Sequence, residues 1–191
     1  MKNFFKVFIV TAGLLLCFNV SSFASVDVAV WGGYAFTGSA DIKGSGDFDY
    51  SATQFGVKGH FNIELSPSVN LGLGAFFQYA KISPDDWGGL SKPKRNAIGL
   101  DVAFIFSTST PALFPYVRAY CSYDKVKILG ESISGYGLGI GGGLEFAVAQ
   151  NVRLFGELMY EAPSYEKTVS GYKLEVDAAQ GAINVGAKFV F

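Results

Sequence analysis

Hydrophobic and polar residues alternate with period two in eight segments of the chain. This alternation places successive side chains on opposite faces and is typical of β-strands with one apolar face. In the fourth segment, for example, Ile98, Leu100 and Val102 share one face, whereas Asp101 lies on the other. The pattern predicts strands near residues 26–36, 53–63, 70–81, 97–106, 116–124, 135–148, 152–161 and 181–191. Because no connection shows helical periodicity, the sequence predicts an all-β antiparallel meander.

The connections between the predicted strands alternate in length. Long, charged connections follow the first, third, fifth and seventh strands, at 37–52, 82–96, 125–134 and 162–180. The connections after the even strands are short, so one end of the fold is expected to carry long loops and the other tight turns. All six prolines are expected in connections or at a strand start, because proline donates no hydrogen bond to a strand ladder.

The last long connection has a pattern of its own. Residues 165–177 alternate around a Ser-Gly pair, which predicts a hairpin of the last two strands that projects beyond the others. The apolar residues are even-numbered at Leu174 and Val176 but odd-numbered from Ile183. This change of parity predicts a bulge or break between Asp177 and Gly181.

An even number of strands in a meander can close into a barrel, which removes exposed edges. The apolar face would point inward in a soluble secreted barrel and outward in a membrane barrel. The polar face favours the membrane barrel, because apart from its few charged residues it carries mostly small residues, which suit a crowded lumen. Aromatic residues also stand at both ends of the apolar face, as at a membrane interface: Phe61, Phe106, Phe146 and Phe191 at one end, and Tyr34, Tyr79, Tyr123, Tyr136 and Tyr160 at the other. The predicted fold is an eight-stranded antiparallel up-and-down transmembrane β-barrel.

The first 24 residues have the features of a secretory signal peptide. Lys2 and Lys6 precede an apolar run at 7–18, and small residues stand at Ser22 and Ala24, where a signal peptidase reads the chain. We therefore predict a signal peptide over residues 1–24, cleaved near Ala24, and a barrel domain over residues 25–191.

The charge of the chain argues against a nucleic-acid partner, and its cysteine content argues against an intrachain disulfide. Loss of Lys2 and Lys6 with the signal leaves 13 of the 15 basic residues against 16 acidic ones. A mildly acidic chain has no electrostatic attraction for nucleic acid, which is therefore not an expected partner. Cys121 is the one cysteine beyond the signal, so no intrachain disulfide is expected.

The chain resembles the eight-stranded outer-membrane β-barrels of the OmpA, OmpX and opacity-protein type of Gram-negative bacteria. The resemblance covers residues 26–191, and its most specific part is the C-terminal AINVGAKFVF, which alternates through Phe189 to a terminal Phe191. In this family such an end is the signal read by the barrel-assembly machinery. The resemblance implies the cell outer membrane, periplasmic termini, external long loops and contact with membrane lipid and lipopolysaccharide.

The charged residues of the polar face predict what fills the barrel. An eight-stranded barrel is just wide enough for side chains to fill its interior, and buried charges are tolerated when they are paired and hydrogen-bonded. Four acidic and four basic strand residues, with the single histidine, are therefore predicted to form a structural ion-pair network: Asp27, Lys58, His60, Asp101, Arg118, Glu145, Arg153, Glu157 and Lys188. The alternative is a gated polar pore, which would make the protein a narrow, porin-like passive channel.

Catalysis, cofactors and metal ions are not expected. Some small outer-membrane barrels modify lipid A, which requires a nucleophile and a base close to the long loops. His60 is the only histidine and falls near the short-turn end, so no Ser-His-Asp arrangement can form at the loops. Two acidic pairs in the loops, one of them Asp85 with Asp86, are weak evidence for a cation site. A lipid A-modifying enzyme is the least favoured alternative.

The long loops are the candidate binding surface. Trp87 stands between Asp86 and Lys92, and an exposed tryptophan flanked by both signs of charge is a candidate contact for a host or surface ligand. The alternative is a solvated loop whose tryptophan folds onto the rim. We expect a surface antigen that acts through its loops in adhesion, envelope integrity or host interaction.

Gly137, Gly139 and Gly142 match the G-x-G-x-x-G spacing of a dinucleotide-binding turn. That motif requires a helix after the glycines, whereas the alternation here continues to Val148. We interpret the odd-numbered glycines as strand residues that leave room in the lumen, with Gly143 opposite Glu157.

Overall fold

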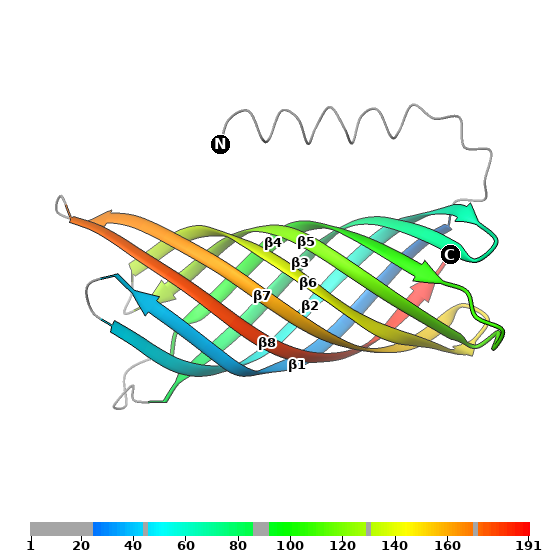
Figure 1. The fold of residues 1–191 in the computed structure, drawn as a ribbon, viewed down its shortest axis with the longest axis horizontal. Coiled ribbons are helices and arrows are strands. Elements are labelled where there is room, and N and C mark those ends of the chain that lie inside the picture. Colours follow the sequence, from blue (N-terminus) through cyan, green and yellow to red (C-terminus); the bar gives the residue numbers. More distant parts are fainter. Residues whose placement is uncertain (1–24, 44–45, 86–91, 129–130, 170–171) are drawn as a thin grey trace, which may run out of the picture.

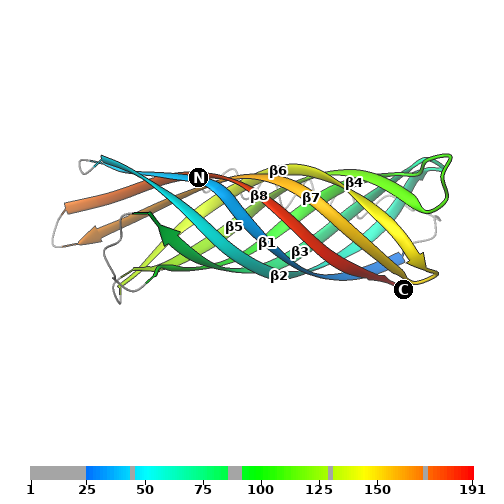
Figure 2. The ribbon, with the colours of Figure 1, turned by 90° about the horizontal axis from the view of Figure 1, so that it is seen from below.

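The structure, a computed structural model, describes residues 25–43, 46–85, 92–128, 131–169 and 172–191. These residues form eight antiparallel strands, each paired with its neighbours in sequence, and β8 pairs with β1 to close a barrel. The strands are β1 (Ser25–Ile42), β2 (Gly46–Ser66), β3 (Val69–Pro84), β4 (Lys94–Phe106), β5 (Leu113–Ile128), β6 (Glu131–Ala149), β7 (Val152–Val169) and β8 (Tyr172–Val190). Figures 1 and 2 show the closed barrel from two sides, with all strands tilted against its long axis. The predicted fold class is confirmed.

No helix in the described part of the chain is long and apolar enough to cross a membrane. The predicted signal peptide, residues 1–24, lies outside the described residues and stays a prediction.

The aliphatic and aromatic side chains of the apolar face point out of the barrel. Leu138 and Val185, for example, are 66% and 62% exposed, and Ile183 is also exposed. Exposed aromatic residues flank this apolar belt, with Phe61, Phe106, Phe146 and Phe191 at the short-turn end and Tyr34, Tyr123, Tyr136 and Tyr160 at the long-loop end. A continuous outward apolar belt between two aromatic girdles is a lipid-facing surface, which decides against the soluble barrel.

The strands are longer than predicted at the long-loop end. β1 continues to Ile42, β2 begins at Gly46 and β7 continues to Val169, so most residues assigned to the loops 37–52 and 162–180 belong to strands. We call the described residues beyond the tyrosine girdle, namely 37–43, 46–53, 80–85, 92–96, 124–128, 131–135, 161–169 and 172–179, the extension. The extension forms the left end of the barrel in Figure 1.

The extension reverses the pattern of the lipid-facing part, with apolar residues inside and charged residues outside. In β8 the even-numbered side chains Asn184 and Val176 both point inward and are buried, whereas Asp177 is exposed. The β7–β8 register runs without a shift from Glu161↔Gln180 to Ser164↔Asp177. The predicted bulge between Asp177 and Gly181 is therefore wrong.

The parity of apolar residues changes in β8 because the medium outside the strand changes from lipid to water, while the strand itself stays regular. The irregularity lies instead in β1, where the register shifts between Ala35 and Gly38. The prolines also depart from the prediction, because Pro84 ends β3, Pro115 is the third residue of β5 and Pro163 lies well within β7. The β7–β8 ladder has no pair at Pro163, consistent with its missing N–H.

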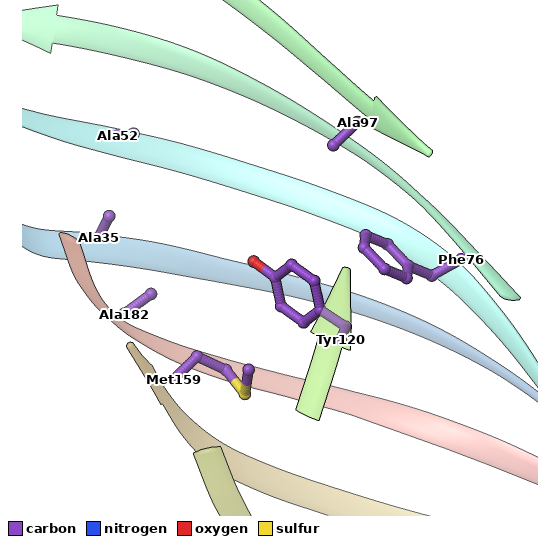
Figure 3. Packing of buried hydrophobic residues seen from close by; sticks show 7 residues of the cluster. All are labelled: Ala35, Ala52, Phe76, Ala97, Tyr120, Met159 and Ala182. Atoms are coloured by element: carbon purple, nitrogen blue, oxygen red, sulfur yellow. The ribbon is translucent and has the colours of Figure 1, made fainter. Parts of the chain in front are cut away.

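Side chains pack the lumen of the lipid-facing part. Phe76 and Tyr120 meet edge to face with ring centroids 4.8 Å apart, and Met159 lies beside them (Figure 3). Four alanines from other strands complete this cluster: Ala35, Ala52, Ala97 and Ala182. Large side chains opposite small ones fill the narrow interior, as an eight-stranded barrel requires.

The glycine-rich segment lies within β6, with no helix after it, as interpreted from the sequence. Gly143 pairs with Glu157 across the β6–β7 ladder. A Cβ added at Gly139 would overlap the ring of Tyr120, and one at Gly141 would overlap the carbonyl oxygen of Leu158. These glycines make room for large inward side chains of the neighbouring strands.

Candidate functional site

The nine residues predicted for the lumen all point into the barrel, and the structure joins them in one chain of ion pairs. Eight of the side chains are at most 4% exposed, and Arg153, at the short-turn end, is 25% exposed. The chain of contacts runs Arg153–Glu145–Lys188–Asp27–His60–Asp101–Arg118–Glu157–Lys58.

Glu157 has the most partners in this network. Its carboxylate lies 3.1 Å from Lys58 Nζ and 3.1 Å from Arg118 Nη1. It also accepts hydrogen bonds from the Tyr116 hydroxyl at 2.8 Å and from Asn184 Nδ2 at 3.0 Å. One buried carboxylate on β7 thus ties together β2, β5 and β8.

His60 lies between two carboxylates, far from the extension. Its Nδ1 is 3.0 Å from Asp27 Oδ1 and its Nε2 is 3.0 Å from Asp101 Oδ1. Asn62 donates to the second oxygen of Asp27 at 2.9 Å. Both ring nitrogens are therefore occupied by structural contacts within the lumen.

A second buried polar cluster, which the sequence analysis missed, lies at the base of the extension. Arg95 Nε donates to Asp124 at 2.6 Å, and Arg95 Nη1 donates to Glu161 at 2.7 Å. Buried amides link this cluster to the first network through hydrogen bonds that join Glu161, Gln180, Gln54 and Asn184 in turn. The predicted lumen network included only charged residues well inside predicted strands. Arg95 fell in a predicted loop, and Asp124 and Glu161 fell at the ends of predicted strands, so none of the three was included. Each of the three nevertheless has the odd or even numbering of the inward residues of its strand, and this could have predicted that they point inward.

The two networks and the aromatic cluster together close the lumen of the lipid-facing part. Even the charged groups pack against rings, as Lys58 Nζ does 4.5 Å from the ring centroid of Phe155. Among the described residues, no group of three or more His, Cys, Asp or Glu side chains could hold a metal ion.

Above this closed section, the extension contains a partly open cavity of about 300 Å³. Inward residues of several strands form its apolar lining, among them Ile42, Phe48, Ile82, Val126, Ile133 and Val176. Tyr50 also lines it, and burial raises the pKa of the Tyr50 hydroxyl to about 12. At the rim, Lys167 donates to Glu131 at 2.7 Å and lowers the pKa of that carboxyl. The lining is thus mostly apolar and carries few groups that can bind water.

Four exposed lysines form a cluster on the outer surface of the extension, just beyond the tyrosine girdle. Lys81 pairs with Lys94 across β3 and β4, and Lys94 pairs with Lys127 across β4 and β5. Lys125 projects from the same face of β5. No ion pair joins these four lysines, the lysine cluster, to a carboxylate in the part of the chain that the structure describes. Like charges directly opposite each other destabilise a sheet, and among the described residues no carboxylate offsets the repulsion within this cluster.

The remaining predicted residues fall in three places. Trp87 lies outside the described residues. Phe189 and Phe191 are 43% and 76% exposed at the short-turn end. Cys121 projects outward within the apolar belt and is free.

Solved structures of other proteins support the fold of this chain. No protein-family model and no curated protein matches the sequence. Among solved structures, Neisserial surface protein A is similar with a TM-score of 0.58 and 18% identity, over 87% of this chain and 96% of that one. The outer membrane protein OprG from Pseudomonas aeruginosa gives 0.56 and 15%, over 89% and 97%.

This chain has the fold of an eight-stranded outer-membrane β-barrel. AlkL, an outer membrane protein solved in lipid bilayers, is a third barrel of this fold, with a TM-score of 0.50 and 14% identity over 86% of this chain and 90% of that one. The neighbours agree with the predicted resemblance and with the predicted location in the outer membrane. In this barrel a closed lumen is combined with a hollow extension.

Proposed function

We propose that this protein is a non-catalytic surface protein of the outer membrane that binds its partners through the extension and the long loops. The observation that carries the proposal is the division of the barrel into a lipid-facing part with a closed lumen and an extension beyond it. The extension would stand on the cell surface, and both termini would lie in the periplasm. Adhesion, envelope integrity and host interaction are the roles that such a surface serves.

The closed lumen supports a binding protein over the alternative of a narrow channel. The Glu157 carboxylate is fully buried among its four partners, and the amide groups of Gln54 and Gln78 occupy the lumen above it. An ion could pass only if several of these contacts broke together. Separating a buried ion pair is costly, so spontaneous opening should be rare.

We expect the purified barrel to give no discrete single-channel currents in planar bilayers. Conductance is recorded only from samples whose heat-modifiable migration in detergent gels shows that the barrel is folded. Reproducible unitary conductance from such samples would contradict the closed lumen and favour the channel.

Two further observations support a protein without catalysis. The single histidine, His60, is held by Asp27 and Asp101 inside the lumen, away from the extension. The charged groups of the lumen are bound to one another, which leaves them without access to a substrate.

The lysine cluster favours lipopolysaccharide as one partner. Its lysines lie just beyond the girdle, at the depth where phosphate groups of the outer leaflet would meet the barrel wall. Anionic phosphates would offset the repulsion between the paired lysines Lys81, Lys94 and Lys127, for which the described residues supply no carboxylate partner.

We expect replacement of Lys81, Lys94 and Lys127 by glutamine to weaken lipopolysaccharide binding at least tenfold, since each basic residue near an anionic lipid surface contributes about 1 kcal/mol. The measurement is binding of lipopolysaccharide to the barrel in phosphatidylcholine nanodiscs at two salt concentrations. Arginine at the same three positions is the matched control and should retain binding. Equal binding by the glutamine and arginine variants would remove lipopolysaccharide as a partner of this surface.

The loops remain the candidate site for host or surface ligands. Exchange of residues 85–92, which connect β3 to β4 and include Trp87, and of residues 170–171, which connect β7 to β8, for other short polar turns tests this role. Adhesion and serum survival that are unchanged by both exchanges would argue against it.

A further inference from the structure

The interior of the extension has the composition of a hydrophobic core, but its side chains leave a cavity between them. Tyr50, Val126 and Ile133 are buried and belong to one apolar cluster. Other inward apolar residues of that cluster, such as Ile82, Leu174 and Ala178, are only partly buried, because they border the cavity. Protein interiors are normally packed without such spaces, so this apolar cavity is a candidate ligand site.

The size of the cavity sets the size of that occupant. A dry apolar cavity of about 150 Å³ is known to hold benzene. The cavity of the extension, about 300 Å³, lies at the lower limit of the range for small-molecule sites. It would therefore admit a molecule of about a dozen non-hydrogen atoms.

Water is a poor occupant of this cavity. An ordered buried water needs two to four polar partners, and several polar groups of the lining are already bonded to the carboxylates beneath it. Gln180 Nε2 donates to Glu161 at 2.6 Å, and the Tyr165 hydroxyl donates to Asp124 at 3.4 Å. A molecule with an apolar body would cover the lining without displacing hydrogen-bonded water.

The charges at the base of the cavity select an uncharged ligand. Arg95 is part of the lining, and two carboxylates, Asp124 and Glu161, already pair with its single positive charge. An anionic head would meet those carboxylates, and any charge in an apolar cavity carries a desolvation cost. Arg95 Nη2 is nevertheless buried without a hydrogen-bond partner, which leaves one donor for an uncharged oxygen.

We propose that the extension binds an uncharged, mainly apolar small molecule, with an alkyl or aryl body and at most one hydrogen-bond acceptor, in the cavity above Arg95. The inference rests on the proposed function and names one class of ligand for the extension. The closed lumen beneath the cavity makes this a site for capture, because the ligand meets the Arg95–Asp124–Glu161 cluster and not an open path.

The test uses 1-naphthol as the fluorescent probe and the folded protein in nanodiscs. Empty nanodiscs at the same lipid concentration give the background from partition into the bilayer. We expect saturable binding above that background at one site per barrel. 1-Naphthalenesulfonate, which has the same ring system but a negative charge, should bind at least tenfold more weakly.

Two adjacent alanines provide a matched pair of variants. Ala178 lines the cavity, whereas Ala179, the next residue of β8, lies outside it on the other face of the strand. Ala178→Phe fills the cavity and should reduce 1-naphthol affinity at least tenfold, whereas Ala179→Phe should leave it unchanged. If Ala178→Phe does not fold, Val176→Thr keeps the side-chain volume, adds a hydroxyl to the lining and should reduce affinity several-fold.

The outcomes separate this inference from the proposed function. No saturable binding, equal effects of Ala178→Phe and Ala179→Phe, or equal affinity for the sulfonate would each overturn the cavity as a ligand site. In that case, a barrel that lies at the cell surface and gives no single-channel conductance would still support the proposed function. Discrete conductance together with binding sensitive to Ala178→Phe would overturn the closed lumen and leave the ligand site standing.

Discussion

Replacing Glu157 with alanine should cost the barrel about 3–5 kcal/mol of stability, the usual effect of removing one partner from a buried ion pair. The loss is large because Lys58 and Arg118 would both remain in the lumen without the carboxylate that lies 3.1 Å from each. The hydroxyl of Tyr116 and the amide of Asn184 would lose the same acceptor. Urea titration of the barrel in lipid vesicles, followed by the fluorescence of buried Trp31, measures the change.

An exposed ion pair of the same chemistry is the matched control. Lys167 donates to Glu131 at 2.7 Å at the rim of the extension, where Glu131 is exposed to solvent. Glu131→Ala should leave the unfolding midpoint unchanged, because water replaces the lost partner. Equal midpoints for Glu157→Ala and Glu131→Ala would mean that the lumen network does not stabilise the barrel.

The sequence predicts the lipid-facing part well because two constraints act there together. Lipid outside and a crowded lumen inside force strict alternation, so parity alone places residues as far apart as Asp27 and Lys188 on the inner face. Pairing around the short turn also places Gly143 opposite Glu157. Period-two spacing therefore determines both the strand count and the inward residues of this part.

Beyond the girdle the medium outside the strands is water, so the inner face is apolar and the outer face is charged. A regular strand with this reversed pattern resembles a loop or a bulge in the sequence. The apparent break near Asp177 and the assignment of Arg95 to a loop both follow from this reversal. The cavity was also beyond prediction, because it depends on how far the strands of the extension stand apart.

Glycine-to-leucine substitution at Gly141 should prevent the barrel from folding. The inward Cβ would fall on the carbonyl oxygen of Leu158 and on the sulfur of Met159, on the neighbouring strand of a closed barrel. Backbone atoms cannot turn aside as a flexible side chain can, so the strain would separate β6 from β7. The measurement is the fraction of heat-modifiable protein after refolding into lipid vesicles, which we expect to fall to background.

Gly156 is the control for that substitution, because it lies in the same β6–β7 pair but faces outward. The nearest heavy atom to a Cβ at Gly156 is the carbonyl oxygen of Asn184, at 4.0 Å, so a leucine there would extend into lipid and should allow normal folding. Nucleotide binding should be absent from the unaltered protein and from both variants, because the G-x-G-x-x-G spacing in β6 arises from alternation and not from a phosphate-binding turn. Normal folding of Gly141→Leu would show that the lumen has free space beside β6, and the closed lumen would then need another explanation than side-chain packing.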